Sequence, residues 1–185
     1  MNKISKSAIL AVFFIVSIMV IIYFTPGSYV FAIEYNNYTS KTFGIEFQYP
    51  SDWKIDEFDE GLAFISDRNF FLTINKVEQD VSGLQALTEE MFKRQTDLGG
   101  HIIKIIEKPI MISTGNLEMG TFLTTWHEED EDEADASANQ FWTFLANKQK
   151  YLITYGNPIA EFNSPENVEI LDHFIKSIKI ISASK

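Results

Sequence analysis

Apolar side chains recur at every second residue in two long stretches of this chain, and helical spacing follows each stretch. In the first stretch Phe43, Ile45, Phe47 and Tyr49 alternate with glycine or polar residues, the pattern of a strand with one buried face. Helical spacing begins near residue 82, strand spacing returns near residue 102, and helical spacing resumes near residue 164. These changes predict the order strands, helix, strands, helix.

Short turns separate the predicted strands, so consecutive strands should pair as antiparallel meanders. Pro109 lies inside one of them and predicts an edge position or a bulge there. The segment from Asn139 to Tyr155 is apolar at adjacent positions, which predicts a central hairpin covered on both faces and a core role for its aromatic residues. The predicted strands span residues 43–49, 53–55, 62–65, 70–74, 102–112, 117–126, 139–145 and 151–155.

Two amphipathic helices should cover this sheet. Ser82 and Gln85 have the spacing of a capping box, and Gly99-Gly100 should end the first helix. Ser164 and Pro165 have the residue types of an N-cap and a first helical position. The apolar stripe of this second helix is predicted to comprise Val168, Leu171, Phe174, Ile175 and Ile178. The predicted class is therefore α+β, a mainly antiparallel sheet with flanking helices in an αβα sandwich.

The first 32 residues have the features of an export signal. Lys3 and Lys6 precede an apolar run from Ala8 to Phe24, which a Pro-Gly pair ends, and Val30 and Ala32 occupy the −3 and −1 positions of a cleavage site. The run is longer than a typical signal core and shorter than a typical span, so a cleaved signal peptide and an uncleaved membrane anchor both remain open. Either way, residues 33–185 are predicted to form one domain outside the cytoplasmic membrane.

The charge and the cysteine content exclude several functions. Removing the N-terminal segment, which holds two lysines and no acidic residue, takes the net charge from −11 to −13. Such a surface repels phosphate backbones, so nucleic acid is not an expected partner. The chain contains no cysteine, which excludes thiol catalysis, thiolate metal sites and a lipidated N-terminal cysteine.

The segment Phe43-Gly44-Ile45-Glu46-Phe47-Gln48-Tyr49-Pro50-Ser51-Asp52-Trp53 resembles the opening G-x-x-F-x-x-P-x-x-W strand and turn of PsbP-like proteins. The family is named for an extrinsic lumenal subunit of photosystem II. The later layout is also similar over residues 36–182, including the glycine before a long hairpin and the closing helix. The resemblance implies an αβα sandwich and an extracytoplasmic accessory or binding role. It does not imply photosynthesis, because the long basic N-terminal extension of the photosystem subunit is missing.

An acidic segment at residues 128–135 contains seven carboxylates in eight residues. Carboxylates supply the oxygen ligands that Ca²⁺ prefers, but the spacing does not match an EF-hand loop. We therefore expect a solvated hairpin tip, with weak Ca²⁺ binding as the alternative. The metal-ligand candidates are Glu128, Glu129, Asp130, Asp132 and Asp135; no other cofactor is expected.

No local catalytic motif occurs in the chain. Its three histidines, His101, His127 and His173, lack the spacing of a zinc site. Asp172-His173 is interpreted as an exposed helix pair rather than a catalytic dyad. Asn37 begins an Asn-Tyr-Thr glycosylation triplet.

These observations predict a non-enzymatic accessory or binding domain. Its expected partner is an extracytoplasmic or membrane protein complex, and it would contact the membrane through an uncleaved N-terminal segment. A Ca²⁺-binding protein and an enzyme whose site assembles only in the fold are the alternatives.

Overall fold

The computed structural model confirms the predicted α+β class. It describes residues 33–66, 71–97, 101–115, 117–128 and 136–181. Residues Glu34–Lys185 form one compact unit, which combines two antiparallel sheets with three helices in its described part. None of the helices within the described ranges has the length and apolar character needed to cross a membrane. The predicted apolar span at residues 8–24 lies outside those ranges.

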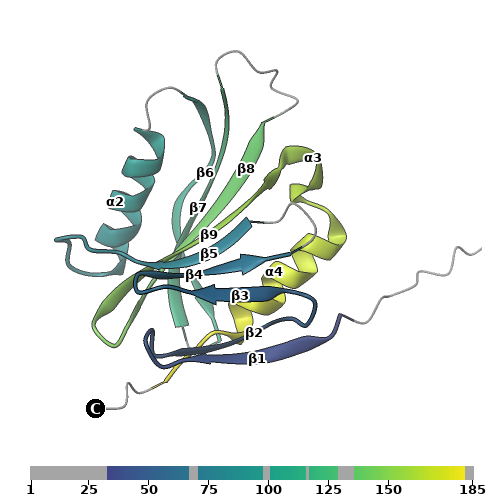
Figure 1. Cartoon of the computed structure of the whole chain (residues 1–185). Coiled ribbons are helices and arrows are strands. Elements are labelled where there is room, and N and C mark those ends of the chain that lie inside the picture. Colours follow the sequence, from purple (N-terminus) through teal and green to yellow (C-terminus); the bar gives the residue numbers. More distant parts are fainter. Residues whose placement is uncertain (1–32, 67–70, 98–100, 116, 129–135, 182–185) are drawn as a thin grey trace, which may run out of the picture. The chain divides into compact units, whose positions relative to one another are not determined.

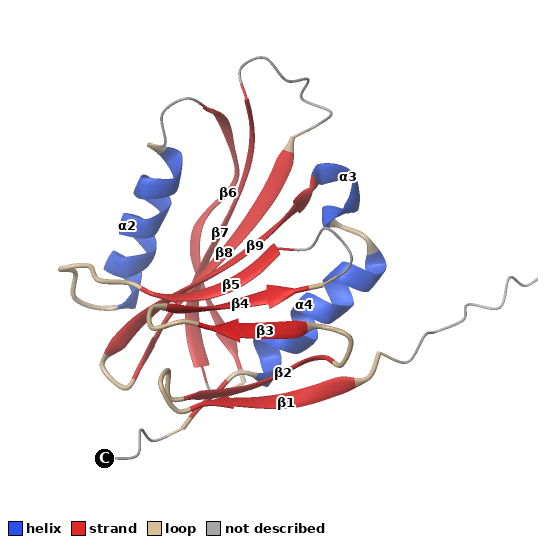
Figure 2. Ribbon diagram, in the orientation of Figure 1, coloured by secondary structure: helices blue, strands red, loops and turns tan. Residues whose placement is uncertain are grey.

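The larger sheet has seven strands in its described part, formed by two meanders that meet edge to edge (Figures 1 and 2). The meanders join where β5 pairs with β9. The strand order is β3(Lys54–Glu57), β4(Gly61–Ile65), β5(Phe71–Lys76), β9(Gln149–Pro158), β8(Ser137–Ala146), β7(Leu117–Glu128) and β6(His101–Thr114). The second meander has the predicted strand order, but its strands are longer than predicted: β9 has 10 residues, where five were predicted.

The strand predicted at residues 43–49 belongs to a separate sheet. As β2(Ile45–Pro50) it pairs with β1(Tyr35–Ser40) on one side and with β10(Lys179–Ile180) on the other. The prediction of one continuous meander from residue 43 was therefore wrong. The alternation predicted the strand correctly, but it cannot specify the partner, because any strand with one apolar face can pair with any other.

The edge strand β6 confirms the expectation drawn from Pro109. Its pairing with β7 shifts register twice, between Ile105 and Glu107 and between Glu107 and Ile110. Proline lacks the N–H that a central strand must donate, and bulges make an edge a poor template for further pairing. The proline and the bulges therefore disfavour pairing of β6 with a strand of another molecule. This matters because β6 carries exposed aliphatic residues, among them Ile105 and Ile110.

The helix ends were predicted with mixed success. The helix α4(Pro165–Ser177) begins as expected, with the Ser164 hydroxyl accepting a hydrogen bond from the Asn167 N–H. The helix α2(Leu84–Thr96) does not use the predicted capping box. Its N-cap is Gly83, at φ 88°, and no side chain caps it. Only glycine enters this conformation without strain, and the extra residue displaces Ser82 from the capping position.

The helices α2 and α4 cover opposite faces of the larger sheet (Figure 1). Adjacent residues of β8 show this most clearly, since Phe141, Trp142, Thr143 and Phe144 are all buried. Phe141 packs with Leu87 and Met91 of α2. Trp142 and Phe144 point to the other face, because successive strand residues alternate. The predicted double coverage of this hairpin is thus confirmed.

Gly120 of β7 allows α2 to lie close to the sheet. A Cβ atom at this position would lie 1.8 Å from the Thr88 hydroxyl oxygen and 2.7 Å from the Thr88 Cβ. The Thr88 hydroxyl also contacts the Thr143 hydroxyl at 2.7 Å. The clash includes the Thr88 Cβ atom, which a side-chain rotation cannot move. Relief of the clash therefore requires α2 to move away from the sheet.

Gly120→Ala should therefore reduce the free energy of unfolding by about 1 to 3 kcal/mol, the usual cost of overpacking. Urea unfolding followed by circular dichroism measures the change. Gly156→Ala is the matched control, because an added Cβ there would approach within 3 Å only of the Asn139 side-chain oxygen, which can rotate away. Equal losses in the two variants would contradict the close-approach explanation.

A hydrogen-bonded carboxylate joins the two sheets. Glu57 of β3 accepts hydrogen bonds from the Tyr38 hydroxyl and, at 2.9 Å, from the Ser40 hydroxyl, both on β1. Burial opposes ionisation of Glu57, but these hydrogen bonds and the nearby Lys76 outweigh it and lower its pKa. Burial, together with the hydrogen bond to Glu57, raises the pKa of Tyr38 to about 12.

The lowered pKa of Glu57 predicts an acid-sensitive contribution to stability. Such a group stabilises the fold above its ordinary pKa, and the contribution disappears as the pH falls through its pKa in the folded state. The stability difference between the native chain and Glu57→Gln should therefore shrink between neutral pH and about pH 3. Urea unfolding at the two pH values tests this, with the exposed Glu60→Gln as control. A constant difference would contradict it.

Candidate functional site

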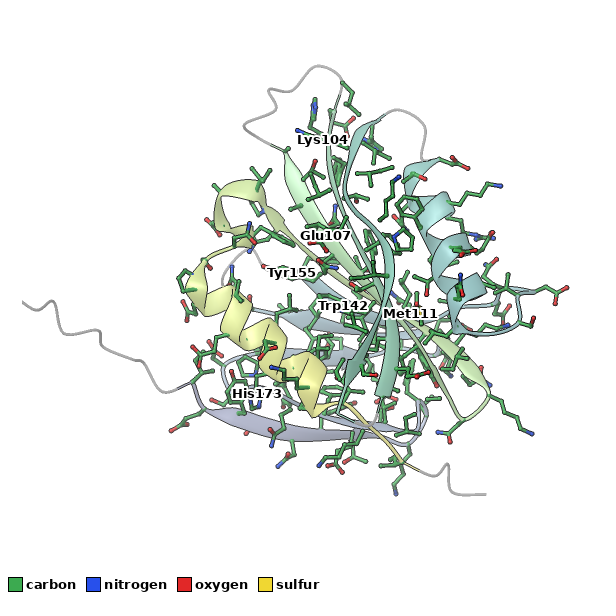
Figure 3. All side chains as sticks on the ribbon, turned by 180° about the vertical axis from the view of Figure 1, so that it is seen from behind. Lys104, Glu107, Met111, Trp142, Tyr155 and His173 are labelled. Carbon is green, nitrogen blue, oxygen red and sulfur yellow. The ribbon has the colours of Figure 1, made fainter. Side chains whose placement is uncertain are left out.

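The main candidate site is a pocket of about 620 Å³ between α4 and the larger sheet, which we call the α4 pocket. Figure 3 shows Trp142 and Tyr155 between α4 and β6. These two residues come from adjacent central strands and form apolar lining. The pocket is lined by residues 112–115 of the β6–β7 hairpin, Gln140, Trp142, Tyr155, Phe162, Asn163, Val168, Leu171, Asp172, Ile175 and Lys176.

The pocket forms beside apolar residues of α4 that do not pack into the core. Ile170, Phe174 and Ile175 are buried, whereas Val168 is 50% exposed. Val168 and Leu171, both predicted for the stripe, line the pocket instead. The helix is therefore rotated toward β2 relative to the prediction, and part of its apolar surface is left beside an open part of the sheet.

Hydrogen bonds within the protein engage two of the polar side chains in the pocket lining, Gln140 and Asp172. The Gln140 amide donates to the Thr121 hydroxyl at 2.6 Å and to the Phe122 carbonyl at 3.0 Å. Asp172 accepts from the Lys176 ammonium at 2.7 Å. These groups are already engaged, so the open capacity of the α4 pocket is mainly apolar.

Tyr155 supplies a neutral phenol to the lining. Its hydroxyl donates to the Phe162 carbonyl at 3.4 Å and accepts from the Asn157 amide at 3.3 Å. Burial raises the pKa of the Tyr155 hydroxyl, so the group stays protonated at neutral pH. The ring of Tyr155 therefore offers an apolar surface to the pocket, while its hydroxyl is hydrogen-bonded within the protein.

The predicted metal-ligand candidates lie mostly outside the described residues. Of the five, only Glu128 is described, and one of its carboxylate oxygens lies 3.3 Å from the His101 Nδ1. Glu129, Asp130, Asp132 and Asp135 fall in the undescribed segment, as does most of the predicted tip. In the ranges that are described, no three acidic, histidine or cysteine side chains cluster as metal ligands.

Weak Ca²⁺ binding by the acidic tip therefore stays a prediction. Calorimetric titration of the chain with Ca²⁺ near physiological salt should give an affinity of about 1 mM or weaker, as in loosely organised extracellular sites. Replacing residues 128–135 with a short Gly/Asn turn should keep the fold, because exposed like charges contribute no packing. Saturable micromolar binding that this replacement abolishes would contradict the prediction.

Asp172 and His173 engage different partners. His173 Nε2 lies 2.8 Å from the Gln48 side-chain oxygen, and its ring stacks on Tyr35 at 3.8 Å between centroids. Asp172 pairs with Lys176. Asp172 is exposed as predicted, but His173 is half-buried.

Asn37, the predicted glycosylation site, is exposed on β1. Its side-chain oxygen accepts a hydrogen bond from the Gln48 amide at 3.0 Å. Thr39, the third residue of the triplet, is exposed as well. Glycosylation of Asn37 itself stays a prediction.

Solved structures identify the fold. A cyanobacterial PsbP (CyanoP) from Synechocystis sp. PCC 6803 superimposes with a TM-score of 0.61 at 13% identity, over 85% of this chain and 99% of that one. The domain has a PsbP-like fold. The chain is also similar to a protein from Bacteroides thetaiotaomicron, with a TM-score of 0.54 at 10% identity, over 80% of this chain and 49% of that one.

A third similar solved structure is LpqN, involved in cell envelope biogenesis of Mycobacterium tuberculosis. It has a TM-score of 0.46 at 13% identity, over 86% of this chain and 98% of that one. No protein-family model matches the chain, and no curated protein sequence does. At 13% identity the match to the cyanobacterial PsbP shows the fold alone, and the function is argued from the site.

The α4 pocket was not predicted from the sequence. Trp142 and Tyr155 were interpreted as core residues, and both are largely buried, yet both also line the pocket. One signal was present: the predicted apolar stripe of the closing helix was wide enough to bury one part and leave another open. Which part stays open depends on the rotation of α4, and helical spacing alone does not specify that rotation.

Proposed function

We propose that this protein is an exported, non-enzymatic accessory domain that binds an apolar or amphipathic small molecule in the α4 pocket. The observation that carries the proposal is the pocket itself. Its volume of about 620 Å³ falls in the range of small-molecule sites, and its lining is predominantly apolar with a few polar groups at its margin.

A binding role explains the chemistry of the lining better than catalysis does. A general acid or base must reach the reacting atoms with a free proton or lone pair. In this pocket Asp172 is paired with Lys176, Gln140 is hydrogen-bonded to β7, and Tyr155 is neutral. These groups are suited to orienting a ligand at the margin of an apolar surface.

The N-terminal segment supports a location outside the cytoplasm for this proposed activity. Lys3 and Lys6 before the apolar run favour retention of the N-terminus in the cytoplasm and export of the remainder. We propose that the domain acts on the outer side of the cytoplasmic membrane, together with an extracytoplasmic or membrane protein complex. If the segment is not cleaved, it also anchors the domain there.

Export is tested on protein isolated from the native cell. Mass spectrometry should find either a new N-terminus at Ile33 or an intact N-terminus in the membrane fraction. Crosslinking in intact cells, followed by identification of the crosslinked proteins, then names the complex. Recovery of the full-length chain from the soluble cytoplasm would contradict export by either route.

Binding in the α4 pocket is tested with Nile red, an uncharged apolar dye, added to the purified full chain. The dye should give saturable fluorescence enhancement, and the double variant Val168→Gln, Leu171→Gln should weaken dye binding by about tenfold or more, since both changes place amides in the apolar wall.

The matched control is Ile110→Gln, Met111→Gln. These residues are exposed to a similar degree as Val168, at 53% and 46%, but lie on β6 outside the pocket lining. The control should leave dye binding unchanged, and thermal unfolding should show that both variants are folded. An equal loss of dye binding in the two variants, or no saturable binding, would contradict the proposed site.

A further inference from the structure

A second pocket lies on the opposite face of the larger sheet, and we call it the α2 pocket. It has a volume of about 250 Å³ and lies between the end of α2 and strands β6 to β9. Asn139 and Thr154 line it, whereas their neighbours Gln140 and Tyr155 line the α4 pocket. Since successive strand residues point to opposite faces, the two sites are separated by the thickness of the sheet.

The lining of the α2 pocket is rich in uncharged hydrogen-bonding groups. Thr124 and Asn139 are direct cross-strand partners, and Thr154 is diagonal to Asn139 on the next strand. Gln95 contributes an amide from the last turn of α2. Three adjacent strands and one helix thus present two hydroxyls and two amides to one small space.

These four groups are not satisfied by the protein. Within the described ranges, the side chains of Gln95, Thr124, Asn139 and Thr154 make no hydrogen bond to another residue. Thr124 is only 3% exposed. Gln95, Asn139 and Thr154 are half-buried, and none of the four side chains is among the fully buried polar atoms that lack a partner. Water or a ligand that enters the pocket can therefore supply their hydrogen-bond partners.

Gly156 helps to shape the polar lining that β8 and β9 contribute to the α2 pocket. Gly156 lies directly opposite Asn139 in the β8–β9 ladder. A Cβ atom there would lie 2.6 Å from the Asn139 side-chain oxygen. The absence of a side chain at Gly156 therefore leaves room for the Asn139 amide over β9.

The charges around the α2 pocket favour a neutral ligand. Lysine, arginine, aspartate and glutamate are absent from the described lining. His101 is the one titratable residue in it, and the Glu128 carboxylate lies 3.3 Å from its Nδ1. An anion would meet this carboxylate and a chain of net charge −11, while a cation would find few oxygen ligands with full charge.

Aromatic rings complete the lining. Trp126 lines the pocket and meets His101 edge to face, with ring centroids 5.0 Å apart. The faces of aromatic rings carry partial negative charge, which attracts weakly polarised C–H groups. The site therefore combines neutral donors and acceptors with an aromatic surface, in a space smaller than the pockets that take drug-sized ligands.

We infer that the α2 pocket binds a single neutral sugar ring. Sugar hydroxyls donate and accept, so they match the amide and threonine groups, and the C–H face of a pyranose ring matches the indole of Trp126. The ring is either a free monosaccharide or the terminal residue of a glycan outside the cell. This site is independent of the proposed ligand of the α4 pocket.

Sugar titrations of the purified full chain test the inference. A sugar-free detergent is used if the N-terminal segment is retained, because maltoside detergents would occupy the site. Glucose, galactose, mannose and N-acetylglucosamine are added separately, and two-dimensional ¹H–¹⁵N spectra are recorded. At least one sugar should bind saturably, with shifts concentrated around residues 124–126, 139 and 154.

Matched threonine variants localise the binding. Thr124→Val should weaken sugar binding by about tenfold, roughly the loss of one well-placed hydrogen bond. Thr125→Val is the control, because Thr125 is the next residue of β7, is also nearly buried at 8% exposure, and points to the opposite face. It should leave sugar binding unchanged. Asn139→Ala provides a second variant if Thr124→Val does not fold.

Two further titrations identify the source and the charge preference of the ligand. A glycan that carries the preferred sugar at its end should bind more tightly than the free sugar if the source is a glycan, and no more tightly if it is a monosaccharide. The 6-phosphate of the same sugar should bind more weakly than the neutral form. Absence of saturable binding by all four sugars, preference for the phosphate, or binding that Thr124→Val and Asn139→Ala leave unchanged would overturn the inference.

Discussion

Replacing Phe174 with alanine is expected to lower the free energy of unfolding by about 3 to 5 kcal/mol, the usual cost of truncating a buried aromatic residue. Phe174 is fully buried on α4. Its ring lies 5.3 Å, between centroids, from Phe47 of the smaller sheet and 5.3 Å from Phe64 of the larger sheet. One side chain thus joins a helix and both sheets, so the cavity would lie where three elements meet.

Urea unfolding of Phe174→Ala measures this loss. The control is Val168→Ala on the same helix, where half of the side chain is exposed and the expected loss is below about 1 kcal/mol. Similar small losses in both variants would mean that α4 is not anchored through Phe174. The α4 pocket should also lose Nile red binding in Phe174→Ala, because the pocket wall depends on the position of this helix.

Replacing Trp53 with alanine should have an effect of the same size, about 3 to 5 kcal/mol. Trp53 follows the Pro50 turn, where its N–H donates to the Pro50 carbonyl at 3.1 Å. It is 5% exposed and meets Phe64 edge to face, with centroids 6.2 Å apart. Trp53 is therefore a core residue. The residue lies just before β3, on the connection from the smaller to the larger sheet.

Thermal and urea unfolding test the Trp53 prediction. Phe58→Ala is the control, because Phe58 lies in the turn that follows β3 and is 59% exposed. The control should change stability by less than about 1 kcal/mol. A loss that small in Trp53→Ala would show that the indole adds little to the core despite its burial.

Most local features of the chain were predicted well, with the capping box at Ser82 as the exception. Ser164 and Pro165 begin α4 as their residue types indicate, because an N-cap depends on atoms a few residues apart. Asn147 and Lys148 form the tight turn between β8 and β9, with φ values of 51° and 65°. The double burial of β8 also followed from its adjacent apolar residues. Such patterns concern neighbouring residues, whose geometry the backbone restricts.

Long-range pairing was predicted less well. The turn residue Asn147 donates to the Gly44 carbonyl at 3.3 Å and to the Ile181 carbonyl at 3.0 Å. Tyr151 donates to the Phe43 carbonyl at 2.8 Å. The two contacts with Gly44 and Phe43 connect residues about a hundred positions apart. They help to place β2 in a sheet separate from β3. Nothing in the spacing of residues near position 45 indicates such distant partners.

The candidate sites show the same division. Periodicity specifies which faces of β8, β9 and α4 are apolar, because side-chain direction repeats with the backbone. It does not specify how far a helix rotates against a sheet, since several rotations bury similar apolar area. The rotation of α4 leaves Val168 and Leu171 beside Trp142, and the approach of α2 over Gly120 brings Gln95 beside Thr124 and Asn139. Both pockets therefore arise from packing between elements distant in the chain, whereas the strands and helices that form them follow from local pattern.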